Sequence, residues 1–276
     1  MPLRAKAELL LKLHQGPRAL LLPNVWDVAS ARLIEEAGFP ALATSSAAIA
    51  NSLGYPDGQQ IGRTAMLEVV GRIVQAVKVP VTADLEAGYG QSAEQMVETT
   101  NELLESGAVG LNLEDGLEER ALVAAEEHGA KVRAVREAGE AAGVHIVINA
   151  RTDVYLAQVG PPESRFDETL RRGRLYRQAG ADCIFVPGLC DAVTIGRLVK
   201  ELGCPVNLLA GPGCPSIAEL EKLGVARVSL GSSPHRATLG LLRRLAQEIR
   251  EQGTYSALEG MVSYAEANAL FHPRKQ

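Results

Sequence analysis

Acidic side chains with the spacing of a metal site follow two apolar runs of this sequence. Asp84 and Glu86 stand two residues apart, just after the run 79–83. Glu114 comes after the next run, 109–113. If both runs are strands, alternation along an extended chain puts the first two acids on one side, and the third arrives from the neighbouring strand. Because three converging carboxylates repel one another, we expect a bound cation, and oxygen ligands without nearby histidine or cysteine favour Mg²⁺ or Mn²⁺.

One arginine offers a partner for an anion at the same end of the predicted sheet. Arg151 follows the apolar run 147–150, and an inward position would be costly unless the side chain met an anion. A substrate carboxylate or a developing enolate suits a planar guanidinium. The alternative is a permanent pair with Asp153 or Glu114. The acids, for their part, could instead cap helices or pair with arginines, Arg63 among them.

Small and polar residues end other predicted strands. Ser45, Ser46 and Ala47 offer short side chains and backbone N–H groups that can hold a carboxylate or phosphate, although small residues after a strand are common. Asn207 lies in the seventh predicted strand, and we assign it to substrate binding together with these three residues, Asp84 and Arg151. Asp57 lies on a loop shaped by glycine and proline that could reach over the pocket, or it is a plain turn aspartate.

Eight short apolar runs are the elements that would position these residues. Each is followed by a polar cluster and a helical pattern, which is typical of alternating β and α units around a buried parallel sheet. The runs are 19–22, 41–44, 79–83, 109–113, 145–150, 183–186, 206–209 and 227–230. They favour a (β/α)₈ TIM barrel of the α/β class, in which all strands end at one mouth. A doubly wound nucleotide-binding sheet needs Gly-x-Gly-x-x-Gly after its first strand, and residues 23–27 lack it.

Length and helix signals point to one domain with an appendage. The 276 residues suit a single barrel domain over 1–276. Asp27 is placed as the N-cap of a helix over 28–37, and glycines end this and later helices. Residues 237–251 read as the closing helix, and 254–276 as a C-terminal appendage with an extra helix and an apolar stripe. Since a complete barrel does not need that stripe, we expect a homo-oligomer, either a dimer or a tetramer.

Composition excludes several classes of partner. The formal net charge of −5 gives no basic footprint for nucleic acid or an anionic membrane, so a small molecule is expected. No apolar run approaches the roughly 20 residues of a membrane span, and charged residues interrupt the N-terminal run too early for a signal peptide. Four cysteines without Cys-x-x-Cys spacing predict neither a zinc site nor a disulfide framework. A cytoplasmic protein with free thiols is expected.

The order of these motifs resembles the isocitrate lyase/phosphoenolpyruvate mutase superfamily. The likeness runs from about residue 20 to about residue 230 and depends on segments 23–27, 44–46, 54–57, 84–90, 113–115 and 149–153. It implies a barrel that binds Mg²⁺ and the oxo-acid or enolate end of the substrate, commonly as a tetramer that exchanges C-terminal helices. In the family an Asp-x-Asp pair holds the metal, and here Glu86 replaces the second aspartate. By position, Asp84 and Glu114 match metal-linked acids, Arg151 the enolate-binding arginine, Asp57 a metal-shell aspartate, and Ser45 with Ser46 the turn that grips the substrate carboxylate.

The loop after Glu114 departs from the family pattern. Cleaving members carry Lys-x-Cys-Gly-His there and phosphonomutases Lys-x-Asn-Ser, whereas residues 116–122 of this chain read Gly-Leu-Glu-Glu-Arg-Ala-Leu. Without the acid/base cysteine, a proton would come from water, Glu118 or Tyr55. Decarboxylation of a 2-oxo dicarboxylate needs no protein acid to expel its leaving group, and so it suits this loop at least as well as isocitrate-type lysis.

Together these features predict a Mg²⁺- or Mn²⁺-dependent lyase. It would act on a carbon–carbon bond of a 2-oxo acid, a dicarboxylate or the corresponding 2-hydroxy acid adduct, through an enolate held by the metal and Arg151. One alternative is a phosphonopyruvate or phosphoenolpyruvate mutase-type enzyme. Another is a 2-oxo acid-binding protein with little turnover. A further possibility gives Cys214 the role of nucleophile or acid.

Overall fold

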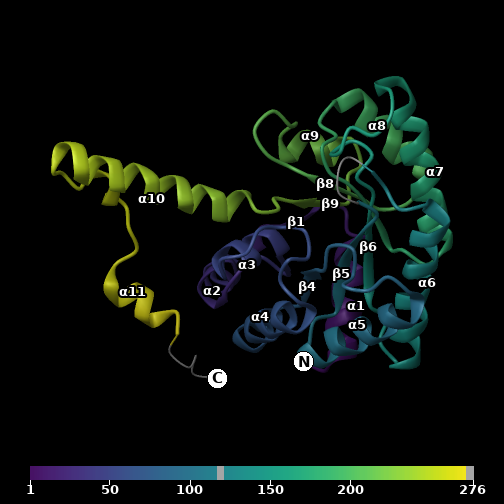
Figure 1. The fold of residues 1–276 in the computed structure, drawn as a ribbon, viewed down its shortest axis with the longest axis horizontal. Coiled ribbons are helices and arrows are strands. Elements are labelled where there is room, and N and C mark those ends of the chain that lie inside the picture. Colours follow the sequence, from purple (N-terminus) through teal and green to yellow (C-terminus); the bar gives the residue numbers. More distant parts are fainter. Residues whose placement is uncertain (117–120, 272–276) are drawn as a thin grey trace.

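The chain folds into an α/β barrel of the (β/α)₈ TIM type, as its eight apolar runs predict (Figure 1). The computed structural model describes residues 1–116 and 121–271. All neighbouring strands are parallel, in the order β1-β9-β8-β7-β6-β5-β4-β3-β2 around a nearly closed barrel. The strands are β1 Leu20–Leu22, β2 Asn24–Val25, β3 Leu42–Thr44, β4 Val81–Asp84, β5 Gly110–Glu114, β6 Val147–Arg151, β7 Cys183–Val186, β8 Val206–Leu209 and β9 Arg227–Ser229.

The first predicted strand, 19–22, corresponds to β1, which pairs with β9, and beyond Pro23 lies a short additional strand that was not predicted, β2, which pairs with β3. Proline has no N–H for the ladder, so it interrupts the pairing. Asn24 bridges this junction: its Oδ1 accepts from the backbone N–H groups of Leu230 (2.9 Å) and Gly231 (2.7 Å), and its Nδ2 donates to the carbonyl of Thr44 (2.7 Å). The asparagine therefore ties both sides of the seam together.

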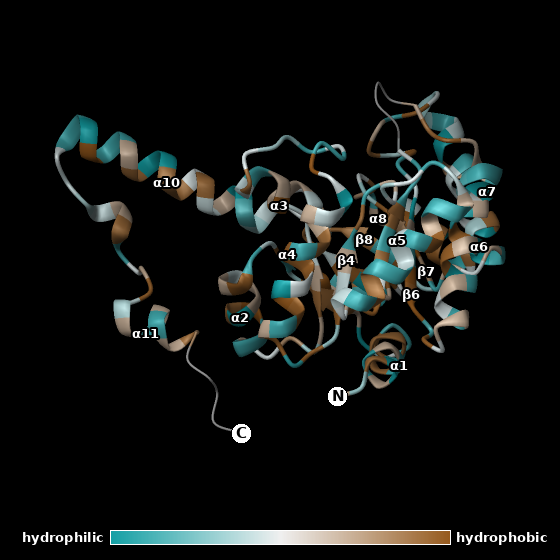
Figure 2. Ribbon diagram, turned by 60° about the horizontal axis from the view of Figure 1, so that its bottom comes forward, coloured by the Kyte–Doolittle hydropathy of each residue, from teal (hydrophilic) through white to brown (hydrophobic). Residues whose placement is uncertain are grey.

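Helices cover the outside of the barrel, and the strands beneath them consist largely of hydrophobic residues, coloured brown in Figure 2. The prediction for the first barrel helix is confirmed, because Asp27 Oδ1 accepts from the N–H of Ser30 at 2.7 Å as N-cap. Gly107 and Gly203 end their helices in the left-handed conformation, also as predicted. The covering helices are α2 Val28–Glu36, α3 Ser46–Ser52, α4 Arg63–Ala76, α5 Ala93–Ser106, α6 Ala125–Ala141, α7 Arg165–Gln178, α8 Ala192–Leu202 and α9 Ile217–Lys222, with a 3₁₀ turn, η2, at Pro162–Ser164.

An N-terminal helix that the sequence analysis did not predict, α1 (Leu3–Leu13), packs at the amino end of the strands. Its Ala7 and Leu10 are fully buried. A Cβ atom on Gly110, the first residue of β5, would lie 2.9 Å from Leu10 Cδ2, so glycine permits this close approach. The mouth at the carboxyl ends of the strands is therefore left for the site.

The C-terminal region forms an arm, residues 233–271, that extends from the barrel (Figure 1). A helix is present over the predicted range 237–251 as part of α10 (Ser233–Gln252), but it buries only His235, so the expectation that it closes the barrel is wrong. The appendage over 254–276 contains the predicted extra helix as α11 (Tyr264–Ala269), which Gly260, with φ +78°, separates from a 3₁₀ turn, η3 (Ser256–Leu258). Across the described chain, no helix has the length and apolar character needed to cross a membrane.

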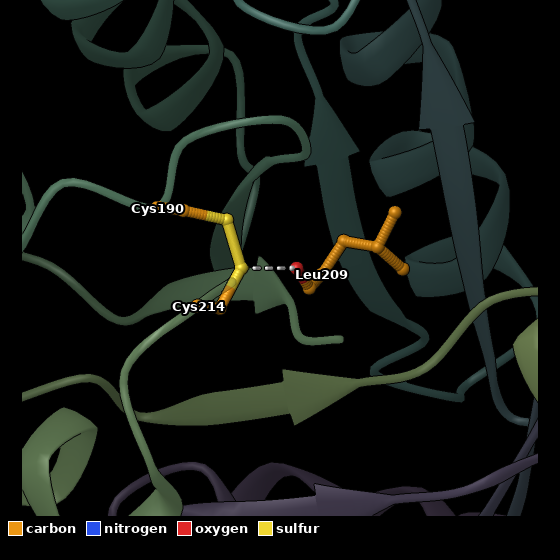
Figure 3. The surroundings of a disulfide bond; sticks show 3 residues. All are labelled: Cys190, Leu209 and Cys214. Atoms are coloured by element: carbon orange, nitrogen blue, oxygen red, sulfur yellow. Dashed lines mark hydrogen bonds between the residues drawn. A yellow bond between two sulfur atoms is a disulfide. The ribbon is translucent and has the colours of Figure 1, made fainter. Parts of the chain in front are cut away.

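Two of the four cysteines are joined, which corrects the prediction of free thiols (Figure 3). Cys190 follows β7 and Cys214 follows β8, and because these strands are neighbours in the barrel, residues 24 apart in sequence meet as a disulfide. Cys183 and Cys204 remain free. The sulfur of Cys214 is thus engaged in this structure, which argues against a role as nucleophile or acid.

Two buried histidines make stability depend on pH. Burial, reinforced by Lys131, lowers the pKa of His128 to about 3, and burial, reinforced by Arg227, lowers the pKa of His14 to about 4. The native state therefore binds fewer protons than the unfolded state below about pH 6.5. We expect the unfolding free energy to fall as pH drops from about 6.5 to about 4, by roughly 1.4 kcal/mol per pH unit for each histidine.

Urea unfolding at a series of pH values checks this expectation. His128→Phe keeps an aromatic ring against Tyr176, whose ring centroid lies 4.6 Å from that of His128. The variant should remove one histidine's share of the slope. An unchanged slope would show that His128 does not cause the acid sensitivity.

Candidate functional site

A cavity of about 150 Å³ opens at the carboxyl ends of the strands, which is where barrel enzymes place their active sites. It brings together residues from β2 through β9 and the loops that follow them. The lining residues are Asn24, Ser45, Ser46, Ala47, Asp57, Asp84, Asn112, Arg151, Leu156, Phe185, Pro187, Leu209, Ser229, Gly231 and Ser232. A larger, mostly apolar pocket of about 890 Å³ lies at the opposite end, around α1 and residues 37–40, and holds none of the predicted site residues.

Among the described residues that line the cavity, Arg151 is the only basic one, and it forms ion pairs with two acidic side chains. Its Nη1 lies 2.6 Å from Oε2 of Glu114, which β5–β6 pairing sets directly opposite. Its Nε and Nη2 donate to the two carboxylate oxygens of Asp153, at 2.6 and 2.8 Å. Burial opposes the charge on Arg151, but these acids outweigh it and raise the pKa of the guanidinium. Burial also raises the pKa of Glu114, to about 8, although Arg151 acts in the opposite direction.

Asp84 ends β4 and is fixed by four hydrogen bonds from neighbouring strands. Its Oδ2 accepts from the backbone N–H (3.0 Å) and the hydroxyl (2.8 Å) of Ser46, and its Oδ1 accepts from Nδ2 of Asn112 at 3.1 Å. Its own N–H donates to the hydroxyl of Thr44 at 2.9 Å. Ser46 therefore orients the acid and does not leave its N–H open for a substrate carboxylate. Asp57 shares the cavity, and burial followed by the charge of Asp84 raises the pKa of Asp57.

Glu86 turns away from the direction that an extended strand would give it. β4 ends at Asp84, and Glu86 has a left-handed backbone with φ +51°, so the expectation that the two acids project from one extended segment is wrong. The carboxylate of Glu86 instead accepts from the N–H of Gln59 at 2.5 Å and from the hydroxyl of Tyr89 at 2.9 Å. Burial raises the pKa of Glu86. These contacts pin the loop after β4.

The donor set suits a hydrated divalent cation better than a three-carboxylate chelate. Among the described residues, no group of three acids, histidines or cysteines converges closely enough to hold an ion by itself. Asp57 and Asp84 nevertheless share a cavity in which Arg151 is the one described base, already bound by two acids. Such an excess of carboxylates favours a cation, and Mg²⁺ keeps several of its waters. Asp84 and Asp57 would hold it, with Glu86 and Glu114 behind them.

The remaining predicted residues fall in different places. Ser45 and Ala47 line the cavity, and the hydroxyl of Ser45 caps α3. Asn207 is fully buried inside the barrel beside Ser229, outside the cavity lining. Tyr55 is 49% exposed and is also not among the lining residues. Glu118 lies outside the described residues.

Asp115 was not predicted from the sequence as a residue of the site, whereas Asp153 was considered there as a partner of Arg151 and does pair with it. Asp153 grips Arg151, and its own N–H donates to Oδ1 of Asp115 at 2.9 Å. Asp115 is fully buried and also accepts from Arg172 (3.0 Å) and the hydroxyl of Tyr176 (2.6 Å) on α7. It thereby ties the ends of β5 and β6 to a covering helix. The available signal was spacing: an acid stands two residues after the arginine, in step with the strand alternation.

Comparison with known proteins shows the family of the chain. Residues 10–250 match the phosphoenolpyruvate phosphomutase family. Oxaloacetate decarboxylase 2 of Pseudomonas fluorescens is 29% identical over 249 residues, covering 87% of this chain and 82% of that protein. A crystal structure from Burkholderia cenocepacia described as a candidate lyase/mutase has a TM-score of 0.91 and 37% identity, covering 98% of this chain and 97% of that one. Phosphonopyruvate hydrolase in complex with oxalate and Mg²⁺ has a TM-score of 0.83 and 26% identity, covering 96% and 94%.

The chain belongs to the phosphoenolpyruvate phosphomutase family, within the isocitrate lyase/phosphoenolpyruvate mutase superfamily, and is a carbon–carbon lyase of that type. The resemblance drawn from its motifs is therefore confirmed.

Proposed function

We propose that the protein is a Mg²⁺-dependent lyase that breaks a carbon–carbon bond of a short 2-oxo acid through an enolate, with oxaloacetate as the first substrate to test. The observation that carries the proposal is the pairing of Arg151 with Glu114 at a mouth that also holds Asp84 and Asp57. An anionic substrate can enter such an acidic site only with a cation. The likeness to an oxaloacetate decarboxylase and to a hydrolase crystallised with oxalate and Mg²⁺ supports this choice.

The residues of the chain would divide the work as follows. Arg151, locked in place by Glu114 and Asp153, donates to the oxygen on which the enolate charge develops. Ser46 and Asn112 hold the Asp84 carboxylate in one orientation for the ion. When bound, Mg²⁺ supplies Lewis-acid polarisation of the oxo group. Water or Glu118 would supply the proton to the enolate carbon, since Tyr55 does not line the cavity.

An assay of oxaloacetate decarboxylation tests the proposal. Pyruvate formation is followed through NADH oxidation by lactate dehydrogenase, with and without EDTA. Because free Mg²⁺ alone catalyses this decarboxylation, the protein-free rate at the same Mg²⁺ concentration is the reference. Turnover well above that reference supports the proposal. No turnover of any C3 to C6 2-oxo acid, and no calorimetric binding of oxalate with Mg²⁺, would overturn it.

The same samples separate two other activities. Phosphorus NMR of a phosphonopyruvate reaction would reveal mutase or hydrolase activity. This test is included because the fold is similar to that of phosphonopyruvate hydrolase. Tight binding of a 2-oxo acid with negligible turnover would instead favour a binding protein.

The C-terminal arm supports a homo-oligomer, either a dimer or a tetramer. It exposes large apolar side chains on α10, on α11 and in the segment between them, among them Leu242 (59%), Tyr264 (87%) and Met261 (70%), respectively. A cavity of about 500 Å³ separates Met261 and its neighbours from Leu33 of α2. A second copy of the chain, inserting its own arm, would cover these surfaces.

We expect light scattering to give the mass of a dimer or tetramer at micromolar concentration, because the apolar side chains of the arm are buried only between copies. Deletion of residues 254–276 should shift the mass toward the monomer. Val193→Arg, on an exposed position of α8 that is 80% accessible, serves as the control and should leave the mass unchanged. A monomeric full-length chain would contradict the expectation.

A further inference from the structure

The cavity wall changes character around the barrel. The side formed by β3 to β6 carries acids, amides, hydroxyls and Arg151. The side over β7 and β8 is apolar and is formed by Phe185, Pro187 and Leu209, to which the loop after β6 adds Leu156. We call these four residues the apolar arc. Because β6, β7 and β8 are consecutive in the barrel, the arc is one continuous surface.

Backbone contact fixes the position of Leu156 in the apolar arc. A Cβ atom on Gly188 would lie only 2.8 Å from the Cα of Leu156 and 2.9 Å from its nitrogen, and Gly188 has φ +82°. Only glycine accommodates both the close approach and the left-handed backbone. The loop after β6 is thereby seated directly on the loop after β7. The arc is therefore built by the fold.

Among the described residues, the apolar arc offers a charged group no unpaired counter-ion, because Arg151, whose guanidinium carbon lies 5.8 Å from the ring centroid of Phe185, is already paired. Arg151 is the basic side chain of the described lining, and Glu114 and Asp153 already occupy it. If Arg151 and the ion bind the oxo-acid end of a substrate, a far end that extends toward β7 and β8 meets the apolar arc, whereas one that extended toward β9 would meet Ser229 and Ser232. A carboxylate against Phe185 and Pro187, the buried members of the arc, is partly desolvated without a new partner, which raises the free energy of its charged form.

Loss of carbon dioxide removes the unfavourable carboxylate charge from the apolar arc. We propose that the apolar arc seats the leaving carboxylate and so selects decarboxylation over lysis to a charged fragment; this inference rests on the proposed function. The carbon–carbon bond to the carboxylate breaks, and its electron pair becomes the new double bond of the enolate, with the charge on the oxo oxygen. Neutral carbon dioxide leaves, and a proton from water then reaches the enolate carbon to give the shorter 2-oxo acid. The negative charge thus moves from the apolar arc toward Arg151, where it is stabilised.

A cation added to the apolar arc tests the proposal. Leu156 is 47% exposed, so Leu156→Arg can be accommodated without burying its charge fully. We expect KM for oxaloacetate to fall, because the carboxylate gains a partner, and kcat to fall on the order of tenfold, because the same partner must be lost as carbon dioxide forms. Leu156→Gln, polar but uncharged, should have a smaller effect on both. Inhibition by oxalate, which lacks the carboxylate that leaves, should be the same in wild type and Leu156→Arg.

The control for adding a surface arginine is Val193→Arg on the neighbouring helix α8, which should leave kcat and KM at wild-type values. If Leu156→Arg keeps or raises kcat for oxaloacetate, the role of the apolar arc is overturned while the proposed function stands. Preference of the wild type for alkyl-substituted 2-hydroxy acids over oxaloacetate would overturn it in the same way. Absence of turnover with every 2-oxo acid in the wild type would mark failure of the proposed function itself.

Discussion

Arg151→Gln is expected to lower kcat/KM for oxaloacetate decarboxylation by on the order of 10³-fold, at the upper end for loss of one oxyanion donor. The guanidinium is the only positively charged group among the described residues that line the cavity. Glutamine cannot replace its charge or its two hydrogen bonds to Asp153. Most of the loss should appear in kcat, since charge develops on the enolate oxygen only as the bond breaks. Steady-state kinetics above the Mg²⁺-only rate measure the effect.

Arg171→Gln is the matched control. Arg171 also carries two acidic partners, Glu168 at 2.9 Å and Glu126 at 3.2 Å, but it lies on the outside of α7 and is about half exposed. Exposed ion pairs contribute little, so kinetics and melting temperature should stay close to wild type. Circular dichroism of Arg151→Gln shows whether Glu114 and Asp153, left without their partner, unfold the mouth of the barrel. A folded Arg151→Gln protein with wild-type kcat would remove the arginine from the mechanism.

The barrel could be predicted because each of its units carries its own local signals. Short apolar runs, an aspartate N-cap and left-handed glycines after helices repeat along the chain, and each signal depends on a few neighbouring residues. The two-residue strand β2 after Pro23 could not be predicted in this way, since it is defined by its pairing with β3, whereas β1 pairs with β9. The Cys190–Cys214 bond likewise depends on β7 and β8 lying side by side.

The arm shows where such signals end. The apolar stripe within 254–276 predicts burial, but it does not show which surface buries it, and among the described residues none covers the exposed apolar side chains of α10 and α11. We infer that the direction in which the arm extends is set by contacts with a second copy of the chain. The sequence shows the need for a partner, and only the three-dimensional structure shows that the barrel itself is not that partner.

The sequence predicted which residues lie at the site, but only part of their geometry and hydrogen bonding. Positions such as Asp84 and Arg151 follow from the rule that strands of a barrel end at one mouth. Ser46 binds Asp84 through hydrogen bonds between segments that are distant in the sequence. Glu86 binds Gln59 and so holds the loop after β4, because its own backbone is left-handed. Spacing carries no information about either. The same limit applies to Asp115, whose partners lie far along the chain on α7.

Asp84→Asn should abolish Mg²⁺-dependent turnover and weaken Mg²⁺ binding by more than roughly 100-fold, the upper end for loss of an outer-shell partner. The asparagine can still accept from Asn112, but its amide nitrogen would face the Ser46 N–H, or its oxygen would lose Asn112. The charge that would hold the ion is lost in either orientation. Competition against Mn²⁺, followed by electron paramagnetic resonance, measures binding independently of activity.

The control, Asp167→Asn, removes an exposed acid from the first turn of α7 and should leave metal binding unchanged. Because the substitution at Asp84 also removes a charge that raises the pKa of Asp57, the metal-free variant should remain folded, with melting by circular dichroism as the check. Wild-type Mn²⁺ affinity in Asp84→Asn would mean that the ion, if it binds, is held elsewhere. The acids at the mouth would then serve Arg151 alone, and enolate stabilisation would depend entirely on the Arg151 side chain that Glu114 and Asp153 hold in place.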